Sequence, residues 1–386
     1  MVSMSLKDMY RTRKEWGSPE SVKVALEFAS GKTVYEYRKA IPLRYGTNPH
    51  QASADYELIG SILTLEEIKT GKSGMSQTNM EDLLHACCIL KYFNEPTCAV
   101  MKHLNPCGVA VKETTKDAFD FAWDCDYQAA YGSVVVFNKP IDRVTAHSIQ
   151  GYFIEVVGAP DFDDDALDIL EKKKDLRVIK ISGIEKLPKF IDDETVPNIK
   201  SLEGTLFLET PYLTKIRSTD DLRNRDLGKT PVIVSKREPT ERELKDLLSA
   251  WYVCSGVRSN GIVLWKNGYS VGIGTGQHDR VTAVRQAIAK SKYLHGYGWH
   301  QVFKKLFDRL SNNQKYEDNL TYSLKDAVIA SDAFFPFHDS IEACGEVGIT
   351  AVIQPGDSIN DGKVIDAANK YDIAMVFTGE RCFAHH

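Results

Sequence analysis

The sequence predicts an α/β protein built from two domains with mixed sheets, and three observations support this prediction. At 386 residues, the chain is well beyond the usual length of a single domain. Short β-branched segments alternate with segments of helical periodicity, which is typical of sheets covered by helices. Between residues 183 and 203, Pro188, Pro197 and a short acidic run interrupt any apolar period and indicate a linker. We therefore expect one domain at residues 1–200, including an N-terminal extension, and a second at residues 201–386.

The first half of the chain contains three apolar, β-branched segments that predict strands. They lie at residues 98–101, 133–137 and 176–181. A helix is expected between the first two strands, at residues 112–123. Another helix is expected to begin behind Asn79, a residue type that caps helix N-termini, with Asp82 three residues later.

The second half repeats this alternation. Strands are predicted at residues 231–235, 262–265, 269–273, 351–354 and 373–377. Asn267-Gly268 predicts the tight turn of a hairpin. Helices are predicted at residues 240–253, 281–292 and 340–346.

Composition narrows the class of protein. Apolar residues make up 43% of the chain and charged residues 26%, the balance of an ordinary globular protein. The formal net charge of -5 provides no general basic field for nucleic acid or an anionic membrane, so we expect neither as a partner. The 8 cysteines lack the spacing of a disulfide framework. The first 16 residues are rich in charge and no run of about 18 apolar residues exists, so we expect a cytoplasmic protein without a signal peptide or a membrane helix.

Residues 43–51 form the first of four segments that combine reactive side chains with Gly and Pro. Arg44 could bind a phosphate or a carboxylate in bidentate fashion, and Tyr45 and His50 add a phenol and an imidazole. The alternative is a surface turn stabilised by Asn48-Pro49.

The second segment begins with Lys102-His103, directly after an apolar strand. Open α/β sheets place ligands at the carboxyl ends of strands. The alternative is a strand that ends in polar residues and a turn containing Pro106. Pro106-Cys107 is similar to part of a deaminase zinc signature, but the His-x-Glu and the second Cys of that signature are missing, so we expect no catalytic metal.

The third segment joins Ser259-Asn260 to a Gly-rich stretch at residues 272–276, which is followed by a helix and could bind an anion. A purely structural turn is the favoured alternative, because neither the Walker nor the Rossmann spacing is present. The fourth segment, residues 331–339, carries three Phe in four positions. Some of these rings could line a slot for a flat ligand, with Asp339 as an acceptor, and the alternative is an aromatic turn that caps the core. For the last residues, from Arg381, a frayed tail is the default.

Taken in this order, the segments resemble one family, AICAR transformylase, the formyltransferase part of a bifunctional enzyme of purine biosynthesis. The resemblance covers about residues 40–386. It rests on Arg44-Tyr45-Gly46-x-Asn48-Pro49-His50-Gln51, Lys102-His103-x-Asn105-Pro106-Cys107-Gly108, Ser259-Asn260, Gly272-Ile273-Gly274-x-Gly276-Gln277, Ser331-Asp332-Ala333-Phe334-Phe335-Pro336-Phe337 and Arg381-x-Phe383.

The sequence departs from the family pattern in three places. The usual Ser-Tyr-Asn-Asn is Ser76-Gln77-Thr78-Asn79 here. His385, rather than His386, matches the His that normally ends the chain. The family's IMP cyclohydrolase domain has no counterpart in the first 40 residues, so we expect a stand-alone transformylase without the ring-closure activity.

The resemblance implies two tandem cytidine-deaminase-like, three-layer domains and a homodimer with active sites at the subunit interface. It implies formyl transfer from 10-formyltetrahydrofolate to the 5-amino group of AICAR, giving FAICAR, without a catalytic metal and with a possible structural monovalent cation. The implied catalytic residues are Lys102, His103, Asn260 and His385. The implied nucleotide-binding residues are Arg44, Tyr45, Thr78, Asn79, Gly132, Glu155, Arg381 and Phe383. The implied folate-binding residues are Arg280, Val281, Phe334, Pro336, Phe337 and Asp339.

Two other functions remain open at this point. The same fold could formylate AICAR with formate and ATP, although the aromatic turn favours a pterin donor. The protein could also be a non-catalytic purine-nucleotide-binding regulator, although the intact Lys102-His103 pair favours an enzyme.

Overall fold

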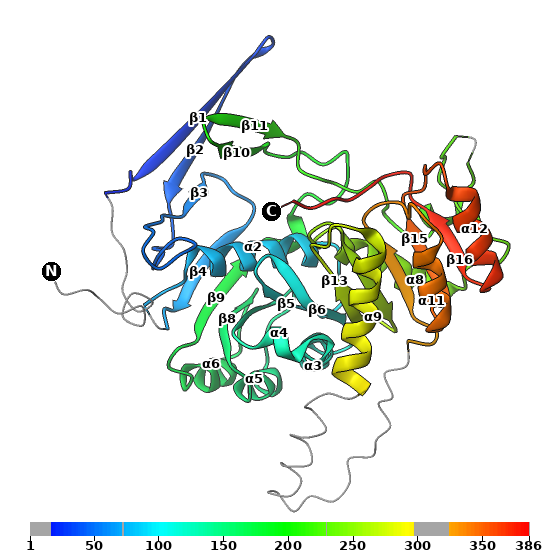
Figure 1. Ribbon diagram of the computed structural model, residues 1–386. Coiled ribbons are helices and arrows are strands. Elements are labelled where there is room, and N and C mark those ends of the chain that lie inside the picture. The colour runs from blue at the N-terminus through cyan, green and yellow to red at the C-terminus, as the bar shows by residue number, and fades with distance from the viewer. Residues whose placement is uncertain (1–16, 72, 229, 297–323, 386) are drawn as a thin grey trace, which may run out of the picture. The chain divides into compact units, whose positions relative to one another are not determined.

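The computed structural model describes residues 17–71, 73–228, 230–296 and 324–385, which form two compact units of mixed α/β structure (Figure 1). The N-terminal unit comprises the residues up to Leu104, together with 111–120 and 128–187. The C-terminal unit comprises residues 105–110, 121–127 and those from Pro188 on. The predicted α/β class is confirmed. The main boundary between the units follows Leu187, which lies inside the segment predicted as a linker and before residue 200. No pattern in the sequence indicated that residues 105–110 and 121–127 belong to the C-terminal unit.

Five strands form the main sheet of the N-terminal unit. Their order is β5 (Thr97–Lys102), β7 (Ser133–Phe137), β8 (Ile154–Ala159), β9 (Arg177–Ser182) and β4 (Thr64–Lys69). β8 is parallel to both of its neighbours, whereas β5 and β4 run antiparallel to theirs, so the sheet is mixed. The strands predicted at 98–101, 133–137 and 176–181 are confirmed as β5, β7 and β9. A separate antiparallel sheet consists of β1 (Ser21–Phe28), β2 (Gly31–Lys39) and β3 (Tyr56–Leu58).

Helix α2 (Gln77–Leu90) packs against β5, β7 and β8. The prediction that Asn79 caps this helix is wrong, because Ser76 is the N-cap and accepts a hydrogen bond from the Asn79 backbone N–H at 3.2 Å. Asn79 is the third helical residue, and its side-chain oxygen accepts from the Ser76 N–H in return, which completes a capping box. The other helices of this part of the chain are α3 (Thr115–Cys125), α4 (Tyr127–Ala130), α5 (Arg143–Gln150), α6 (Asp164–Glu171) and the short η1 (Ile184–Lys186).

Six strands of the C-terminal unit pair in a mixed arrangement. Their order is β16 (Ala374–Phe377), β15 (Ala351–Gln354), β14 (Val328–Ser331), β12 (Ile262–Lys266), β13 (Tyr269–Gly274) and β6 (Asn105–Val111). The Asn267-Gly268 turn between β12 and β13 is confirmed, and both residues have positive φ. The strand predicted at 231–235 is wrong: the segment makes only an isolated bridge from Ile233 to β16, because the N–H of Met375 donates to the Ser235 hydroxyl at 2.7 Å instead of continuing the backbone ladder.

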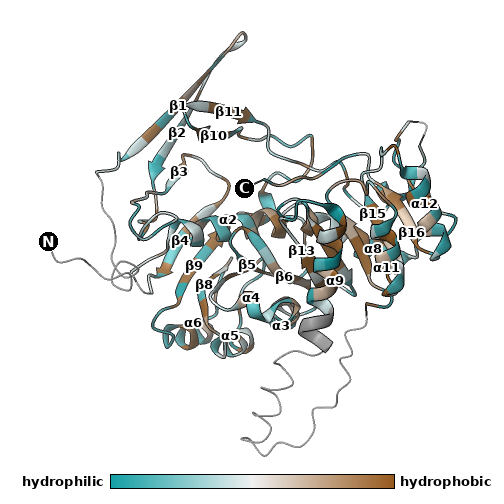
Figure 2. Cartoon of the chain, viewed as in Figure 1, coloured by the Kyte–Doolittle hydropathy of each residue, from teal (hydrophilic) through white to brown (hydrophobic). Residues whose placement is uncertain are grey.

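Helices cover both faces of these six strands. Alternate residues of β12, Ile262 and Leu264, belong to a core shared with α9 (Arg280–Gly296), α11 (Asp339–Glu346) and α12 (Asp361–Lys370). Helix α8 (Glu241–Cys254) packs against β12 and β14 and covers the opposite face. Apolar residues accordingly concentrate on the strands (Figure 2). The remaining elements are α7 (Asp221–Asn224) and the hairpin of β10 (Asn198–Leu202) and β11 (Thr205–Glu209).

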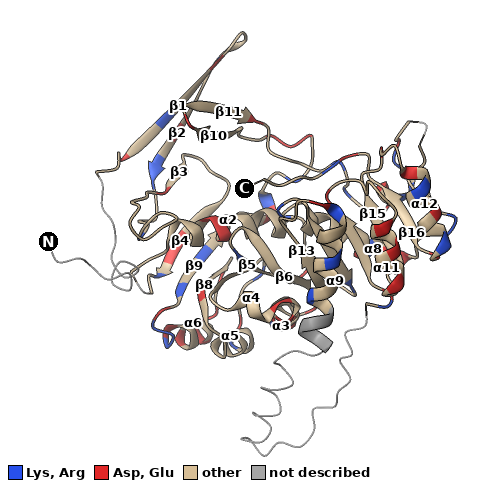
Figure 3. Ribbon diagram, viewed as in Figure 1, with Lys and Arg blue, Asp and Glu red and all other residues tan. Residues whose placement is uncertain are grey.

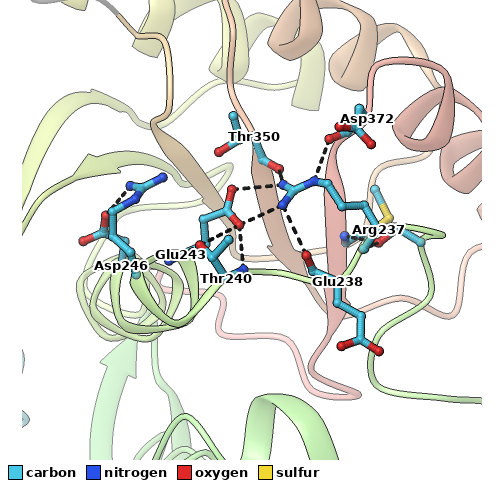
Figure 4. Close-up of polar contacts among 10 residues, drawn as sticks. Arg237, Glu238, Thr240, Glu243, Asp246, Thr350 and Asp372 are labelled. Atoms are coloured by element: carbon cyan, nitrogen blue, oxygen red, sulfur yellow. Dashed lines mark hydrogen bonds and ion pairs between the residues drawn. The ribbon is translucent and has the colours of Figure 1, made fainter.

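An arginine ties the start of α8 to the end of the sheet (Figure 4). Arg237 donates to both carboxylate oxygens of Glu243 at 2.9 and 3.0 Å and to the backbone oxygen of Asp372 at 2.8 Å. The Glu243 carboxylate also accepts from the N–H of Thr240, the N-cap of α8, at 2.8 Å. Burial raises the pKa of Glu243, but the hydrogen bonds from Arg237 and its neighbours outweigh burial and lower the pKa to about 2.

Figure 3 shows acidic residues on α11 and charged residues of both signs on α12. Within the described residues, no helix is long and apolar enough to cross a membrane. The charged segment at residues 1–16 lies outside the described residues, so the expectation drawn from it stays a prediction.

Candidate functional site

The Arg44 loop of the N-terminal unit is held against the start of α2. The backbone N–H of Arg44 donates to the Met75 oxygen at 2.7 Å, and the N–H of Gln77 donates to the Tyr45 oxygen at 2.9 Å. Arg44 is 4% and Tyr45 8% exposed. The alternative of a surface turn therefore fails for these two side chains, although His50 is exposed.

A second buried arginine lies near Arg44. Arg177, 2% exposed, donates to the Gly74 oxygen at 3.0 Å and lies 3.7 Å from the Glu155 carboxylate. Burial lowers the pKa of Arg177, and the positive charge of Arg44 lowers it further. Two guanidinium groups in one buried cluster favour the binding of an anion.

The first turn of α2 belongs to the same cluster. The Asn79 amide donates to Glu155 at 3.2 Å, so the predicted residues Asn79 and Glu155 are in contact. Arg44 lies with its guanidinium carbon 4.7 Å from the Tyr45 ring centroid and donates to the Tyr45 hydroxyl at 3.1 Å. Thr78 lies half-buried in the same turn of the helix.

Lys102 is the last residue of β5, and His103 begins the turn that leads to β6. The Lys102 ammonium donates to the Tyr131 oxygen at 2.6 Å, next to Gly132, which has a φ of 74°. His103 and Leu104 have φ values of 55° and 62°, a backbone region that costs a non-glycine residue on the order of 1 kcal/mol or more. The turn is therefore immediate, whereas the sequence suggested a turn at Pro106, which instead lies inside β6.

The carboxylate of Asp82 accepts from both residues of this turn. Its Oδ2 accepts from the His103 N–H at 3.2 Å and its Oδ1 from the Leu104 N–H at 2.6 Å. Asp82 is 3% exposed and lies one helical turn after Asn79 on α2. One buried face of α2 thus contacts both the Arg44 cluster and the His103 turn.

The C-terminal unit gathers several of the other predicted residues. The Asn260 side chain donates to the Gln277 oxygen at 2.7 Å and accepts from Arg280 at 2.6 Å. Arg280 is buried and pairs with the fully buried Asp332, whose carboxylate also accepts from the Gly261 N–H at 2.9 Å. Arg280 therefore fixes the orientation of Asn260, and the half-buried Val281 follows it in α9.

The Gly-rich stretch serves packing, as its structural alternative predicts. A Cβ on Gly274 would lie 2.1 Å from the Ala283 oxygen, and one on Gly272 would lie 2.4 Å from the Ala287 oxygen. These glycines let α9 approach β13 closely.

The residues before His386 are held in place, so the default of a frayed tail is wrong for them. The N–H of Cys382 donates to the Asp332 oxygen and the N–H of Ser259 to the Ala384 oxygen, each at 3.0 Å. Arg381 lies over the Phe383 ring at 4.8 Å, and the Phe383 and His385 rings are 5.6 Å apart. His386 lies outside the described residues.

The aromatic turn presents two of its three rings to solvent. Phe335 is fully buried, whereas Phe334 is 42% and Phe337 60% exposed. The Pro336 oxygen accepts from Asn360 at 2.8 Å, and Asp339 accepts from the Ser340 N–H at 2.8 Å at the start of α11. The exposed rings could stack on a flat ligand.

Three residues of these clusters were missed as site residues in the sequence. Asp82 entered only as a helix-start signal, Asp332 only as part of a motif, and Arg177 not at all. A charged residue in a mostly apolar segment is the signal that could have found such a residue, and Arg177 stands at the start of β9 in that way. Among the described residues, no group of three or more His, Cys, Asp or Glu is arranged to hold a metal ion.

Comparison with known proteins decides the family. The model of the AICARFT/IMPCHase bienzyme family matches residues 12–290.

The chain belongs to this family. It is 39% identical over 347 residues to the bifunctional purine biosynthesis protein PurH of Caldicellulosiruptor saccharolyticus, which covers 89% of this chain and 59% of that relative. It is 39% identical over 354 residues to PurH of Persephonella marina, covering 90% of this chain and 60% of the relative. PurH of Aquifex aeolicus is also 39% identical, over 346 residues, with 89% and 59% covered. The chain therefore spans about three-fifths of the length of these relatives.

Proposed function

We propose that this protein transfers a formyl group from 10-formyltetrahydrofolate to the 5-amino group of AICAR, giving FAICAR. The observation that supports the proposal most is the buried face of α2, where Asn79 contacts the Arg44 cluster and Asp82 holds the turn of His103. An anion-binding cluster and a candidate proton-transfer group on one helix suit a phosphorylated substrate that must lose a proton. The matched family is that of the AICARFT/IMPCHase bienzyme.

In this proposal the nucleotide phosphate binds the guanidinium groups. Arg44 and Arg381 are the phosphate partners, and Arg177 adds positive charge to the Arg44 cluster. Tyr45, Thr78, Asn79, Gly132, Glu155 and Phe383 hold the rest of the nucleotide.

The chemistry requires two proton movements. The amine nitrogen of AICAR attacks the formyl carbon, the bond from that carbon to N10 of the folate breaks, the amine loses a proton, and N10 gains one. An aromatic amine conjugated to a carboxamide is a poor nucleophile, so His103 takes its proton, together with the substrate carboxamide. Lys102 stabilises the developing oxyanion or helps to protonate N10, and Asn260 orients the carboxamide or the formyl oxygen. His385 is the remaining catalytic residue of the proposal.

The folate side consists of Arg280, Val281, Phe334, Pro336, Phe337 and Asp339. The exposed rings of Phe334 and Phe337 suit stacking on a pterin. Because Arg280 pairs with Asp332 and Asn260, we assign it an indirect part, through the orientation of Asn260. No catalytic metal takes part, and a structural monovalent cation remains compatible with the proposal.

The proposal also includes the state of the protein: a cytoplasmic homodimer in which each chain has two tandem deaminase-like domains. In the β10–β11 hairpin, Leu202, Leu206, Phe207 and Leu208 are each 50–58% exposed, and a second copy of this chain could cover them. Light scattering at assay concentration tests this, and an active monomer would contradict it.

One assay tests the reaction. Purified protein with AICAR and 10-formyltetrahydrofolate should give a product heavier than AICAR by one formyl group in place of one hydrogen, as read by mass spectrometry. Product formed with formate and ATP in place of the folate would favour the alternative donor. Nucleotide binding without turnover under either condition would favour a non-catalytic regulator.

A further inference from the structure

We propose that Asp82 is a positioning residue for His103, and that its two carboxylate oxygens hold the His103-Leu104 turn in the orientation that proton transfer needs. The inference rests on the proposed function in its catalytic part, whereas its structural part can be tested without turnover. Nothing in the sequence motifs assigns Asp82 a role in the reaction.

The geometry is that of a two-point clamp. Each oxygen of Asp82 accepts from one backbone N–H, that of His103 at 3.2 Å and that of Leu104 at 2.6 Å. Both turn residues have positive φ, which L side chains rarely adopt, so the turn needs a partner that selects this backbone conformation. The backbone in turn sets the direction of the His103 Cα–Cβ bond and thereby the region that the exposed imidazole can reach.

Asp82 lies on a helix, α2, that is capped and packed against the sheet. Asp82 is 3% exposed on α2, a helix that begins with a complete capping box and packs against β5, β7 and β8. The same helix carries Asn79, which contacts Glu155 in the cluster proposed to hold the nucleotide. The distance between substrate and proton acceptor is therefore set through one helix, and a small misplacement of a reacting group lowers the rate strongly.

The clamp depends on the charge of Asp82. Burial raises the pKa of Asp82 to about 6, because it outweighs the opposing effects of the two N–H donors and of His103. The titratable neighbours that act on Asp82 are His103 from the turn, which lowers its pKa, and Glu81 from α2, which raises it. An ionised carboxylate accepts with both oxygens, whereas a protonated one has an oxygen that must donate. The clamp should therefore loosen as the pH falls through about 6.

The test is Asp82→Asn, which keeps the shape of the side chain and replaces one acceptor by a donor. The matched control is Glu81→Gln, the same chemical change at the preceding position of α2, where the carboxylate accepts a hydrogen bond from the Gln77 side chain at 2.7 Å. We expect Asp82→Asn to lower kcat by about tenfold or more, with KM for AICAR within about threefold. Glu81→Gln should change kcat by less than about twofold.

A readout that is independent of turnover is the backbone amide of Leu104, followed by NMR. In the wild type its nitrogen shift should titrate with a midpoint near the pKa of Asp82, about 6, and Asp82→Asn should abolish that titration and speed amide hydrogen exchange at Leu104 by about tenfold or more. A wild type that makes no FAICAR overturns the proposed function, and the Leu104 readout then decides on the clamp alone. An unchanged kcat in Asp82→Asn, a rise in KM alone, or a Leu104 amide insensitive to the substitution overturns the inference.

A second variant covers the case in which Asp82→Asn does not fold. Leu104→Gly removes the side chain that makes a positive φ unfavourable at that position. The double variant Asp82→Asn, Leu104→Gly is then compared with Leu104→Gly alone. We expect kcat to fall by about tenfold or more between them, as for Asp82→Asn in the wild type. Equal kcat values in that pair overturn the inference.

Discussion

The assignment of Arg44 to the nucleotide phosphate can be tested by Arg44→Met. Methionine keeps an unbranched stem against the Tyr45 ring, which the guanidinium carbon approaches to 4.7 Å, and removes only the charged fork. Loss of a charge-assisted hydrogen bond weakens binding by roughly 1.5–3 kcal/mol, which corresponds to about 10- to 150-fold in Kd. Arg177 stays fixed by Gly74 and Glu155, so residual affinity for the phosphate should remain.

The assay is calorimetric titration with AICAR and with AICA riboside, which lacks the phosphate. AICAR should lose about 10- to 150-fold in affinity for Arg44→Met, while the riboside should bind the wild type and the variant almost equally. The matched control is Arg285→Met, the same replacement at an exposed position of α9, which should change neither affinity.

Arg44→Lys adds a graded test, because lysine keeps the positive charge without the planar guanidinium. Its affinity for AICAR should lie between those of the wild type and Arg44→Met. If the riboside loses affinity in Arg44→Met as strongly as AICAR does, Arg44 is not the phosphate anchor and the assignment of the whole Arg44 loop is wrong.

Three further predictions follow from the described contacts. His103→Ala should lower kcat by about 100-fold or more and leave the Kd of AICAR within about tenfold, as measured by single-turnover rates and calorimetry, and a larger change in Kd than in kcat would contradict a proton-transfer role. Gly274→Ala should lower the free energy of unfolding by about 2 kcal/mol or more in urea, since its Cβ would lie 2.1 Å from the Ala283 oxygen, whereas Gly362→Ala, with nothing within 4 Å, should be neutral or stabilising. The pKa of Glu243 is lowered to about 2, so its ion pair with Arg237 stabilises the fold above about pH 4.5 and loses that effect as the pH falls towards 2. After a discount for solvent screening, Glu243→Gln should lower the free energy of unfolding by about 1–2 kcal/mol at pH 7. The variant should also show a weaker dependence of that free energy on pH between about 2 and 4.5.

Periodicity in the sequence was enough for the elements whose packing is uniform. The buried segments at β5, β7, β12 and β15 are mostly apolar and each contains β-branched residues, and a sheet that buries both faces selects such a composition. The amphipathic pattern of α8 and the Asn-Gly turn at 267–268 were equally direct. Predictions from residue type were wrong where a neighbouring residue or strand decided the structure. Ser76, and not Asn79, is the N-cap of α2. The segment at 231–235 forms only an isolated bridge to β16.

The motifs by themselves identified residue types suited to a phosphate, an amine and a flat ligand, because these types carry their chemistry in the side chain alone. Only the tertiary structure decided which of them meet. It placed Arg177 beside Arg44 across more than a hundred residues, paired Arg280 with Asp332, and set Asp82 against the backbone of His103. The burial of a charged side chain and its pairing with another charge depend on which distant segments pack together and exclude water. A local sequence pattern does not specify those long-range contacts.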